Sequence, residues 1–503
     1  MINQTAPDTT DDLEEALAGH EELSAEEVAA IKQKSISGVF SYFLRTAILQ
    51  GIGLVSAFLL SAFFNPEDFG VYGYVTQIIG LLVFFSDVGL AASLVQKKDD
   101  PTLKDYRTAF SVQQFLSWLI VVITLVIAQT PLVASKVGVE GKWVLLALAI
   151  SFPLASLKTI PSIKLERKLE FSKLVMPQVF EQLVFYSVLI FLAWRGMGAM
   201  AYSWAILLRS IIGVVVMWLI QSWQIGLAFS KTSFKELISF GAKFQLNDFL
   251  ARIKDQLFFL FLGNFLPLRQ FGYIQWSKTW SMYPYNLTVQ NVMAITFPTF
   301  SRLQKHKNLL KKAIEKSIFF ISLLIFPLLV GMAVFIKPLT QVIPQYSQWE
   351  PAVPSFVMFT LSIGWAALST PLNNTLNAIG KINQTLKLMV LWTSLTWVLT
   401  PILLVLFGFN GVALASLLIS FTSGLSIYFV KKEVPVQVWV NVKHQLLAAA
   451  LMTAVGLGFS RVWSQSISWL VVGGAAASLS YALSILITAR QKLFSEIQSV
   501  RQK

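Results

Sequence analysis

Cysteine is absent from this chain of 503 residues, and charged residues make up only 13% of it. Without cysteine, disulfide bonds, thiol catalysis and thiolate metal sites are all excluded. The scarcity of charge is matched by 55% hydrophobic residues and a mean hydropathy of +0.64. A soluble domain of this length has too little interior to bury so much apolar surface, so the sequence predicts an integral membrane protein.

Long apolar segments recur along the chain after its first 37 residues. A helix needs about 20 predominantly apolar residues to cross the hydrocarbon core of a bilayer. We predict an all-α integral membrane protein with about fourteen such helices. The predicted spans lie near residues 38–63, 70–95, 107–128, 143–160, 175–194, 198–220, 238–263, 272–297, 317–336, 354–378, 386–407, 411–430, 444–460 and 467–488.

The net charge of +14 comes from lysines and arginines in short loops between the apolar segments. If the N-terminus is cytosolic, the inner loops and tails hold roughly 28 of the 40 Lys and Arg, and the outer loops hold roughly six. We therefore expect both termini in the cytosol and no nucleic-acid partner. His20, His306 and His444 then fall on the cytosolic side or its edge, so we expect no histidine metal site and no other cofactor.

Two short segments of the chain resemble each other, Phe63 to Gly70 (FFNPEDFG) and Phe265 to Gly272 (FLPLRQFG). Six spans separate the copies, so both keep the same orientation and predict two lobes related by an axis along the membrane normal. The alternative is that any two short outer turns look alike. The predicted domains are an acidic cytosolic tail (1–35), an N-terminal six-helix lobe (36–222), a C-terminal six-helix lobe (223–430), and two additional helices with a cytosolic tail (431–503).

The seventh predicted span carries ionised side chains near its centre. Each ionised group there costs roughly 2.5 to 3.5 kcal/mol, so such groups persist where they face protein or a water-filled path. Asp248, Arg252 and Asp255 are spaced i, i+4 and i+7, which places them on one helix face. That face can line the cavity of a transport protein. Alternatively, Arg252 pairs with the two carboxylates along its own helix and only holds the fold.

Several short motifs accompany the spans between residues 40 and 310. They are Pro66-Glu67-Asp68-Phe69-Gly70, Ser86-Asp87-Val88-Gly89-Leu90, Gln96-Lys97-Lys98-Asp99, Leu165-Glu166-Arg167-Lys168-Leu169-Glu170-Phe171, Phe271-Gly272-Tyr273 and Phe297-Pro298-Thr299-Phe300-Ser301-Arg302. In these motifs the chain resembles the polysaccharide transporter family, the bacterial oligosaccharide flippases of the multidrug/oligosaccharidyl-lipid/polysaccharide exporter superfamily.

The resemblance implies a flippase of the bacterial inner membrane that transfers undecaprenyl-pyrophosphate-linked sugar units to the outer leaflet by alternating access. Cationic side chains can replace the water around a diphosphate with charge-assisted hydrogen bonds. Carboxylates, Glu181 among them, would balance these cations when no substrate is bound. The implied partners are the lipid-linked oligosaccharide, membrane lipids and other polysaccharide-assembly proteins, and no catalytic residue is expected. The predicted substrate-binding residues are Arg45, Asp87, Arg209, Asp248, Arg252, Lys254, Asp255 and Lys278.

Three other functions are alternatives. A multidrug or cation antiporter of the same superfamily shares the fold, but its cargo favours an acidic cavity, and here the central cations match or outnumber the acids. A membrane polysaccharide polymerase or glycosyltransferase needs acid or base groups on sizeable outer loops, yet the longest, near Lys337 to Pro354, has one carboxylate. A scaffold would keep costly buried charge for no use. Trp276 and Trp280 are candidates to stack on sugars, or else pack in the core or at the interface.

Overall fold

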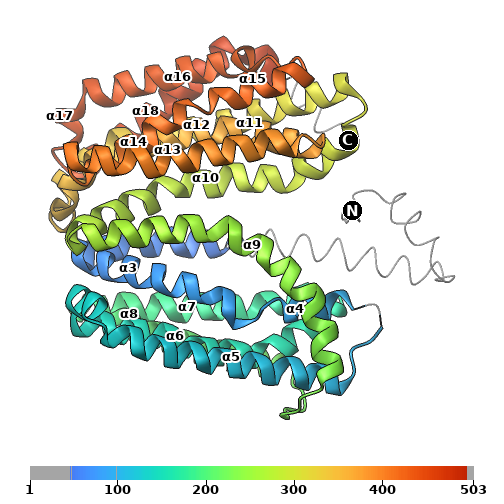
Figure 1. Cartoon of the computed structure of the whole chain (residues 1–503). Coiled ribbons are helices and arrows are strands. Elements are labelled where there is room, and N and C mark those ends of the chain that lie inside the picture. Colours follow the sequence, from blue (N-terminus) through green and yellow to red (C-terminus); the bar gives the residue numbers. More distant parts are fainter. Residues whose placement is uncertain (1–45, 47, 98, 495–503) are drawn as a thin grey trace. The chain divides into compact units, whose positions relative to one another are not determined.

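The computed structural model describes residues 46, 48–97 and 99–494, and the regular elements in this part of the chain are all helical (Figure 1). These residues divide into two compact units, one ending at Gly272 and the other beginning at Tyr273. The first unit contains a helix over Ile48–Phe63, α3 (Pro66–Leu82), the 3₁₀ helix η1 (Val83–Ser86), α4 (Leu90–Gln96), α5 (Leu103–Gln129), α6 (Pro131–Arg167), α7 (Phe171–Trp194), α8 (Met200–Ile220) and α9 (Lys231–Phe265).

The second unit contains most of α10 and the helices that follow it. They are α10 (Leu268–Leu303), α11 (Lys307–Val342), η2 (Pro344–Ala352), α12 (Val353–Ala378), α13 (Ile382–Phe407), α14 (Asn410–Phe421), α15 (Gly424–Glu433), α16 (Val438–Gly458), α17 (Ser460–Trp463) and α18 (Ile467–Thr488). The predicted six-helix lobes divide the chain by its repeat rather than by contacts, and they stay a prediction.

Eleven of the described helices are long and apolar enough to cross a membrane. They coincide with eleven of the predicted spans, which confirms the all-α membrane fold. The other three predicted spans fall on the shorter helix Ile48–Phe63 and on α9 and α10. The prediction that these three also cross, giving fourteen spans in all, stays a prediction. Only 6% of the most apolar part of α13 is buried inside the protein, as expected for a helix that faces lipid.

Helices α3 and α5 each begin with a reciprocal capping box. The backbone N–H of Asp68 donates to the Asn65 side chain at 2.9 Å, and the N–H of Asn65 donates to the Asp68 carboxylate at 3.0 Å. Thr102 and Asp105 repeat the arrangement at the start of α5, at 3.2 and 2.9 Å. Such a box satisfies backbone donors that a helix leaves unpaired in its first turn. These polar residues therefore set where two apolar helices begin.

The beginnings of α3 and α10, both within the first unit, pass each other at glycines. A Cβ atom on Gly70 would collide with the backbone oxygen of Leu268, and one on Gly272 would collide with that of Pro66. The relation is reciprocal, because each glycine meets the residue that lies four positions before the other. Glycine is required at both positions because the two backbones approach more closely than any side chain permits. The predicted repeat copies thus touch at equivalent positions.

Helix α9 completes the first unit by packing on α3. The hydroxyl of Tyr74 donates to the side-chain oxygen of Asn264 at 2.6 Å, across 190 residues of sequence. Further along, Gly80 of α3 lies against the side chain of Gln256, and a Cβ there would come within 2.7 Å of it. The small residue therefore lets the polar side chain of α9 lie close to α3.

The second unit is centred on α11, against which α12, α16 and α18 pack. Tyr481 of α18 donates its hydroxyl to the carbonyl of Leu323 in α11 at 3.1 Å. Beyond the C-terminal end of α11, Trp276 of α10 stacks on Trp349 of η2 with ring centroids 4.8 Å apart, and both residues are fully buried. Because its ring is already covered by protein, Trp276 packs in the core, which was the second of the two roles expected for it.

Candidate functional site

Five of the eight predicted substrate-binding residues lie outside what the structure describes. Arg45 precedes the described residues, and the other four belong to α9 by their backbone while their side chains are not described. The four are Asp248, Arg252, Lys254 and Asp255. Their place in a cavity stays a prediction.

Asp87 lies at the turn between η1 and α4, where its carboxylate caps α4. The backbone N–H of Ala91 donates to this carboxylate at 3.2 Å, and the side-chain amide of Gln113 on α5 donates to it as well. Beside it, Gly89 has a φ of +76° and packs directly on the backbone of Gly241 in α9. The motif around Asp87 thus fixes the start of α4 against α5 and α9. A role for Asp87 in substrate binding stays a prediction.

Lys278 is half-buried on α10 in the second unit. Its neighbour Ser277 is fully buried and donates to the carbonyl of Ala352 at 3.2 Å. The hydroxyl of Ser281 donates to the carbonyl of Lys278 at 2.9 Å. Lys278 therefore lies beside a packed face of α10, and its contact with substrate stays a prediction.

Arg209 belongs to a group of charges that joins three helices of the first unit. Glu181 of α7 contacts Lys158 of α6 through Oε1, and its Oε2 lies 3.9 Å from Nε of Arg209 on α8. The side chains of Lys158, Glu181 and Arg209 are 19%, 14% and 44% exposed. All three lie within helices that are apolar enough to cross a membrane. A carboxylate between two cations offsets part of the cost of keeping each charge out of water. We call these three residues the Glu181 cluster.

Aromatic and glycine residues shape the surroundings of the Glu181 cluster. The guanidinium of Arg209 lies over the ring of Phe185, with Cζ 5.4 Å from the ring centroid. The carboxylate of Glu181 lies against α8 at Gly213, where a Cβ atom would collide with it. Tyr72 of α3 and Tyr186 of α7 are within electrostatic range of Arg209. Protein therefore surrounds Glu181, while Arg209 keeps an exposed edge.

Lys158 is the cation of the cluster that is absent from the predicted substrate-binding residues. The structure places it well inside α6, which continues to Arg167. A signal was present in the sequence, since the predicted span 143–160 already contains this lysine. A lysine inside a span needs an acidic partner or a route to water. The partner is Glu181, 23 residues away on the next helix.

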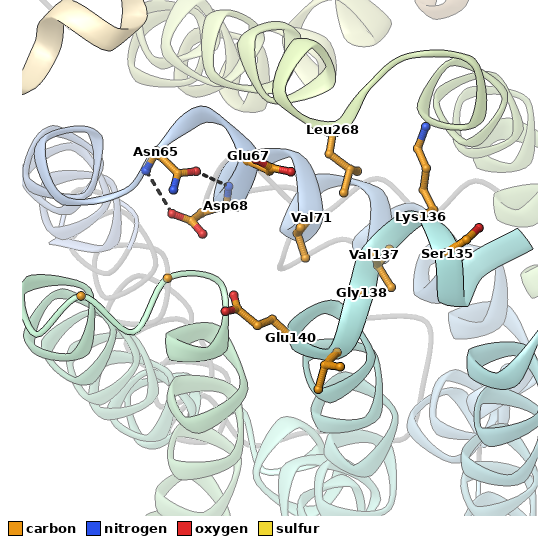
Figure 2. Close-up of a pocket in the computed structure, with 13 residues that line it drawn as sticks. Asn65, Glu67, Asp68, Val71, Ser135, Lys136, Val137, Gly138, Glu140 and Leu268 are labelled. Carbon is orange, nitrogen blue, oxygen red and sulfur yellow. Dashed lines mark hydrogen bonds between the residues drawn. The ribbon is translucent and has the colours of Figure 1, made fainter. Parts of the chain in front are cut away.

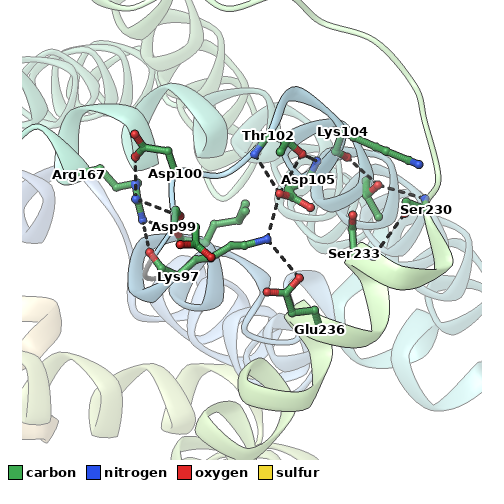
Figure 3. A network of polar contacts seen from close by, with 12 residues as sticks. Lys97, Asp99, Asp100, Thr102, Lys104, Asp105, Arg167, Ser230, Ser233 and Glu236 are labelled. Atoms are coloured by element: carbon green, nitrogen blue, oxygen red, sulfur yellow. Dashed lines mark hydrogen bonds and ion pairs between the residues drawn. The ribbon is translucent and has the colours of Figure 1, made fainter.

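A network of polar contacts lies at the end of the first unit where α4 ends and α5 begins (Figure 3). The ammonium of Lys97 lies 3.1 Å from the carboxylates of both Asp105 and Glu236. Burial lowers the pKa of Lys97, but the hydrogen bonds and charges of the two acids outweigh burial and raise this pKa above its usual value. Lys97 stays charged and ties α4 to the starts of α5 and α9. We call Lys97, Asp100, Asp105, Arg167 and Glu236 the Lys97 network.

Arg167 closes the C-terminal end of α4 within this network. Its Nη1 donates to the carbonyls of Leu94, Val95 and Lys97 at 3.1, 3.1 and 2.8 Å. Its Nη2 lies 3.0 Å from the carboxylate of Asp100, and Figure 3 shows Arg167 beside Lys97 and Asp100. The last carbonyls of a helix have no partner within the helix, so a guanidinium can satisfy several of them at once. The two sequence motifs that contain Lys97 and Arg167 therefore contact each other at the end of α4.

A cavity of about 550 Å³ lies at the opposite end of the first unit, where α5 ends and α6 begins. Figure 2 shows the carboxylates of Glu67, Asp68 and Glu140 around it. A Cβ on Gly198 would lie 3.1 Å from Asp68 and 3.3 Å from Glu140, so both acids border one spot. Lys136 donates to the backbone carbonyl of Leu266 at 2.5 Å. We call this hollow the Glu140 pocket, and its fixed charge is mainly negative.

Known proteins resemble this chain along most of its length. A family model described as polysaccharide biosynthesis protein matches residues 59–354. The lipopolysaccharide biosynthesis protein WzxC of Escherichia coli (strain K12) is 21% identical over 415 residues, which cover 80% of this chain and 81% of that protein. The succinoglycan biosynthesis transport protein ExoT of Rhizobium meliloti (strain 1021) is 19% identical over 470 residues, which cover 88% of this chain and 91% of that protein.

Two solved structures share the fold. The lipid II flippase MurJ in an inward closed conformation matches with a TM-score of 0.68 and 15% identity, covering 91% of this chain and all of that chain (100%). An inward-facing multidrug resistance MATE family transporter of the MOP superfamily matches with a TM-score of 0.54 and 13% identity, covering 78% of this chain and 98% of that chain. The family resemblance noted in the motifs is confirmed by the family model. Because that model spans more than half of the sequence, the chain belongs to the polysaccharide biosynthesis protein family.

Proposed function

We propose that this protein is a flippase that moves undecaprenyl-pyrophosphate-linked oligosaccharide units across the bacterial inner membrane by alternating access. The observation that carries the proposal is the Glu181 cluster, which places two cations and one carboxylate on three membrane-length helices. A diphosphate must leave water to cross the membrane, and such cations can replace its hydration. The likeness to a succinoglycan biosynthesis transport protein and to a lipid II flippase supports a lipid-linked glycan as the cargo.

A multidrug or cation antiporter is the second candidate function. The MATE-type fold and the acids of the Glu140 pocket favour it. In the Glu181 cluster, however, cations outnumber the carboxylate two to one, and a cationic cargo would be repelled there. An anionic cargo fits this balance of charge better, so the flippase is preferred.

We infer that the Lys97 network faces the cytosol and that the Glu140 pocket faces the outside, with both termini cytosolic. The excess of lysine and arginine in the loops on the Lys97 side supports this orientation. Single cysteines in place of Lys168 and Glu67, both exposed, distinguish the two sides by labelling with an impermeant thiol reagent in intact cells.

We further infer that the lobes 36–222 and 223–430 alternate in opening the path, and that other polysaccharide-assembly proteins are partners. The relatives carry names of transport and biosynthesis proteins, and moving a substrate between leaflets breaks no covalent bond. The proposed function therefore needs no catalytic residue.

The proposal is tested by the initial rate at which purified protein in liposomes flips a fluorescent pyrophosphate-linked oligosaccharide. Arg209→Ala should lower this rate about tenfold or more, because a charge-assisted hydrogen bond contributes roughly 1.5–3 kcal/mol. Arg209→Lys should retain part of the activity, since the charge survives but the planar fork does not. The matched control is Arg195→Ala, because Arg195 also lies over aromatic rings but is exposed just after α7. Wild-type protein that flips no pyrophosphate-linked sugar but exchanges an organic cation would establish the antiporter instead.

A further inference from the structure

The two cations of the Glu181 cluster hold the carboxylate unequally. Lys158 makes the close contact, whereas Nε of Arg209 lies 3.9 Å from Oε2. Charge-assisted hydrogen bonds between a guanidinium and a carboxylate have donor–acceptor distances of about 2.7–2.9 Å. Arg209 therefore attracts Glu181 by charge without engaging it through the planar fork that matches two oxygens of one anion.

Access to the cluster is also unequal. The Glu181 side chain is 14% exposed and the Arg209 side chain is 44% exposed. The guanidinium lies over the ring of Phe185, and the attraction of the ring face for a cation helps to hold it there. The cluster thus has a buried acidic end and an accessible cationic end.

We propose that Lys158 and Arg209 form an anion site, which Glu181 occupies until the phosphate or diphosphate of a lipid ligand displaces its carboxylate. This inference rests on the proposed function and deepens it, because it assigns a competing acid to one particular site. Carboxylate and phosphate oxygens are interchangeable partners for an ammonium and a guanidinium. The exchange keeps an anion between the cations at every stage, which avoids the high cost of uncompensated charge within the membrane.

The competition explains how a site can bind a diphosphate and still release it. A diphosphate carries more negative charge than one carboxylate, so it displaces Glu181 on arrival. Glu181 remains tethered on α7 beside the same cations, and its return favours departure of the ligand. Without the acid, the two cations would retain the ligand for longer.

Gly213 provides an independent way to disturb this competition. It leaves the space on α8 that the Glu181 carboxylate occupies, and a Cβ atom there would collide with that carboxylate. Gly213→Ala therefore displaces the acid while every charge of the cluster is kept. Glu181→Gln removes the charge while the size of the side chain is kept. Both changes weaken the competitor, so both should act on ligand binding in the same direction.

The test measures binding of undecaprenyl diphosphate without sugar to the full chain in nanodiscs of zwitterionic lipid. Glu181→Gln should raise the affinity about tenfold, and Lys158→Gln or Arg209→Gln should lower it about tenfold, the scale of one charge-assisted hydrogen bond. Gly213→Ala should raise the affinity about threefold, because the acid is displaced rather than removed. Gly474→Ala is the control, since Gly474 lies in α18 with nothing within 4 Å of an added Cβ.

A second arm replaces the diphosphate with phosphatidylglycerol in the nanodisc. If the variants rank in the same order of affinity for both ligands, the site binds lipid phosphates in general. If they rank in this order only for the diphosphate, the site is specific for the carrier lipid. If Glu181 only holds the fold, Glu181→Gln will lower the unfolding temperature and bind the diphosphate no more tightly than wild type, which overturns the inference. If the wild type flips the pyrophosphate-linked sugar but Glu181→Gln binds the diphosphate with unchanged affinity, this inference alone is rejected. If the wild type neither binds the diphosphate nor flips the sugar, the proposed function is rejected too.

Discussion

The Lys97 network and the Glu181 cluster both join helices of the first unit through lysine–carboxylate contacts, yet they hold their acids in different ways. Asp105 accepts from Lys97 at 3.1 Å and from the backbone and hydroxyl of Thr102, both at 2.9 Å. Glu181 has one close cation and another at 3.9 Å. At helix ends the backbone offers unpaired donors and acceptors, whereas in mid-helix those groups are already bonded to each other. An ion pair near a helix end is therefore locked, meaning that backbone hydrogen bonds also hold its acid in place. An acid in mid-helix has no such bonds and can exchange its partner.

The largest effect that would test this contrast is expected at Asp105. Asp105→Ala removes the capping box of α5 and leaves the half-buried Lys97 with Glu236 alone. We expect the free energy of unfolding to fall by about 2–4 kcal/mol, since the loss of the Asp105 half of the capping box and the loss of a buried partner both contribute. Thermal unfolding in detergent measures it. The control Asp99→Ala removes an exposed acid from the same loop, and equal losses in the two variants would show that Asp105 is not locked as described.

An intermediate effect distinguishes the two regions directly. Lys158→Met combined with Glu181→Leu removes both partners of the close pair, and we expect stability within about 1 kcal/mol of wild type. Glu181→Leu alone should cost more, because it leaves both cations of the Glu181 cluster without an acid. The matching double change, Lys97→Met with Asp105→Leu, should remain destabilising because the backbone N–H and the hydroxyl of Thr102 lose their acceptor with the acid. Thermal unfolding of the two double variants and of their four single variants measures the two couplings. If the two double variants lost equal stability, the distinction between locked and exchangeable ion pairs would be wrong.

The smallest effect is expected at the rim of the Lys97 network. The Glu236 side chain is 56% exposed, so its contact with Lys97 is screened by water. Glu236→Gln should change the free energy of unfolding by no more than about 0.5 kcal/mol, and still less at high salt. Chemical or thermal unfolding at two salt concentrations measures it. A loss as large as that of Asp105→Ala would mean that the whole network, rather than its buried part, is locked.

Periodicity and length were sufficient to predict the membrane fold, because each span must satisfy its own backbone within a lipid environment. Motif residues were harder to interpret. Asp87 and Arg167 carry charge in family motifs, yet the structure shows one capping the start of α4 and the other closing its end. A sequence gives the charge of a side chain but not the backbone group that it reaches.

The Glu181 cluster could be predicted only in part for a related reason. Spacing along one helix relates residues such as Asp248 and Arg252, because a helix has a fixed period. Lys158, Glu181 and Arg209 lie on three different helices. Tertiary packing decides which sides of these helices contact one another. Glu181 was predicted to balance a cation, but neither its partners nor the space left by Gly213 follows from the order of residues.

The close passage of Gly70 and Gly272 has a consequence for how the chain is made. Tyr74 of α3 can form its hydrogen bond only after Asn264, 190 residues later, has been synthesised. In the same way, the backbone at Gly70 can contact Leu268 only after α10 has begun. At a synthesis rate of about 5–20 residues per second, α3 spends about 10–40 s in the membrane before these contacts can form. During that interval its capped end and its glycine face must stay unoccupied by other inserted helices. The first unit therefore cannot finish folding when its first helices are inserted, because its last contacts form only after the ribosome has reached α10.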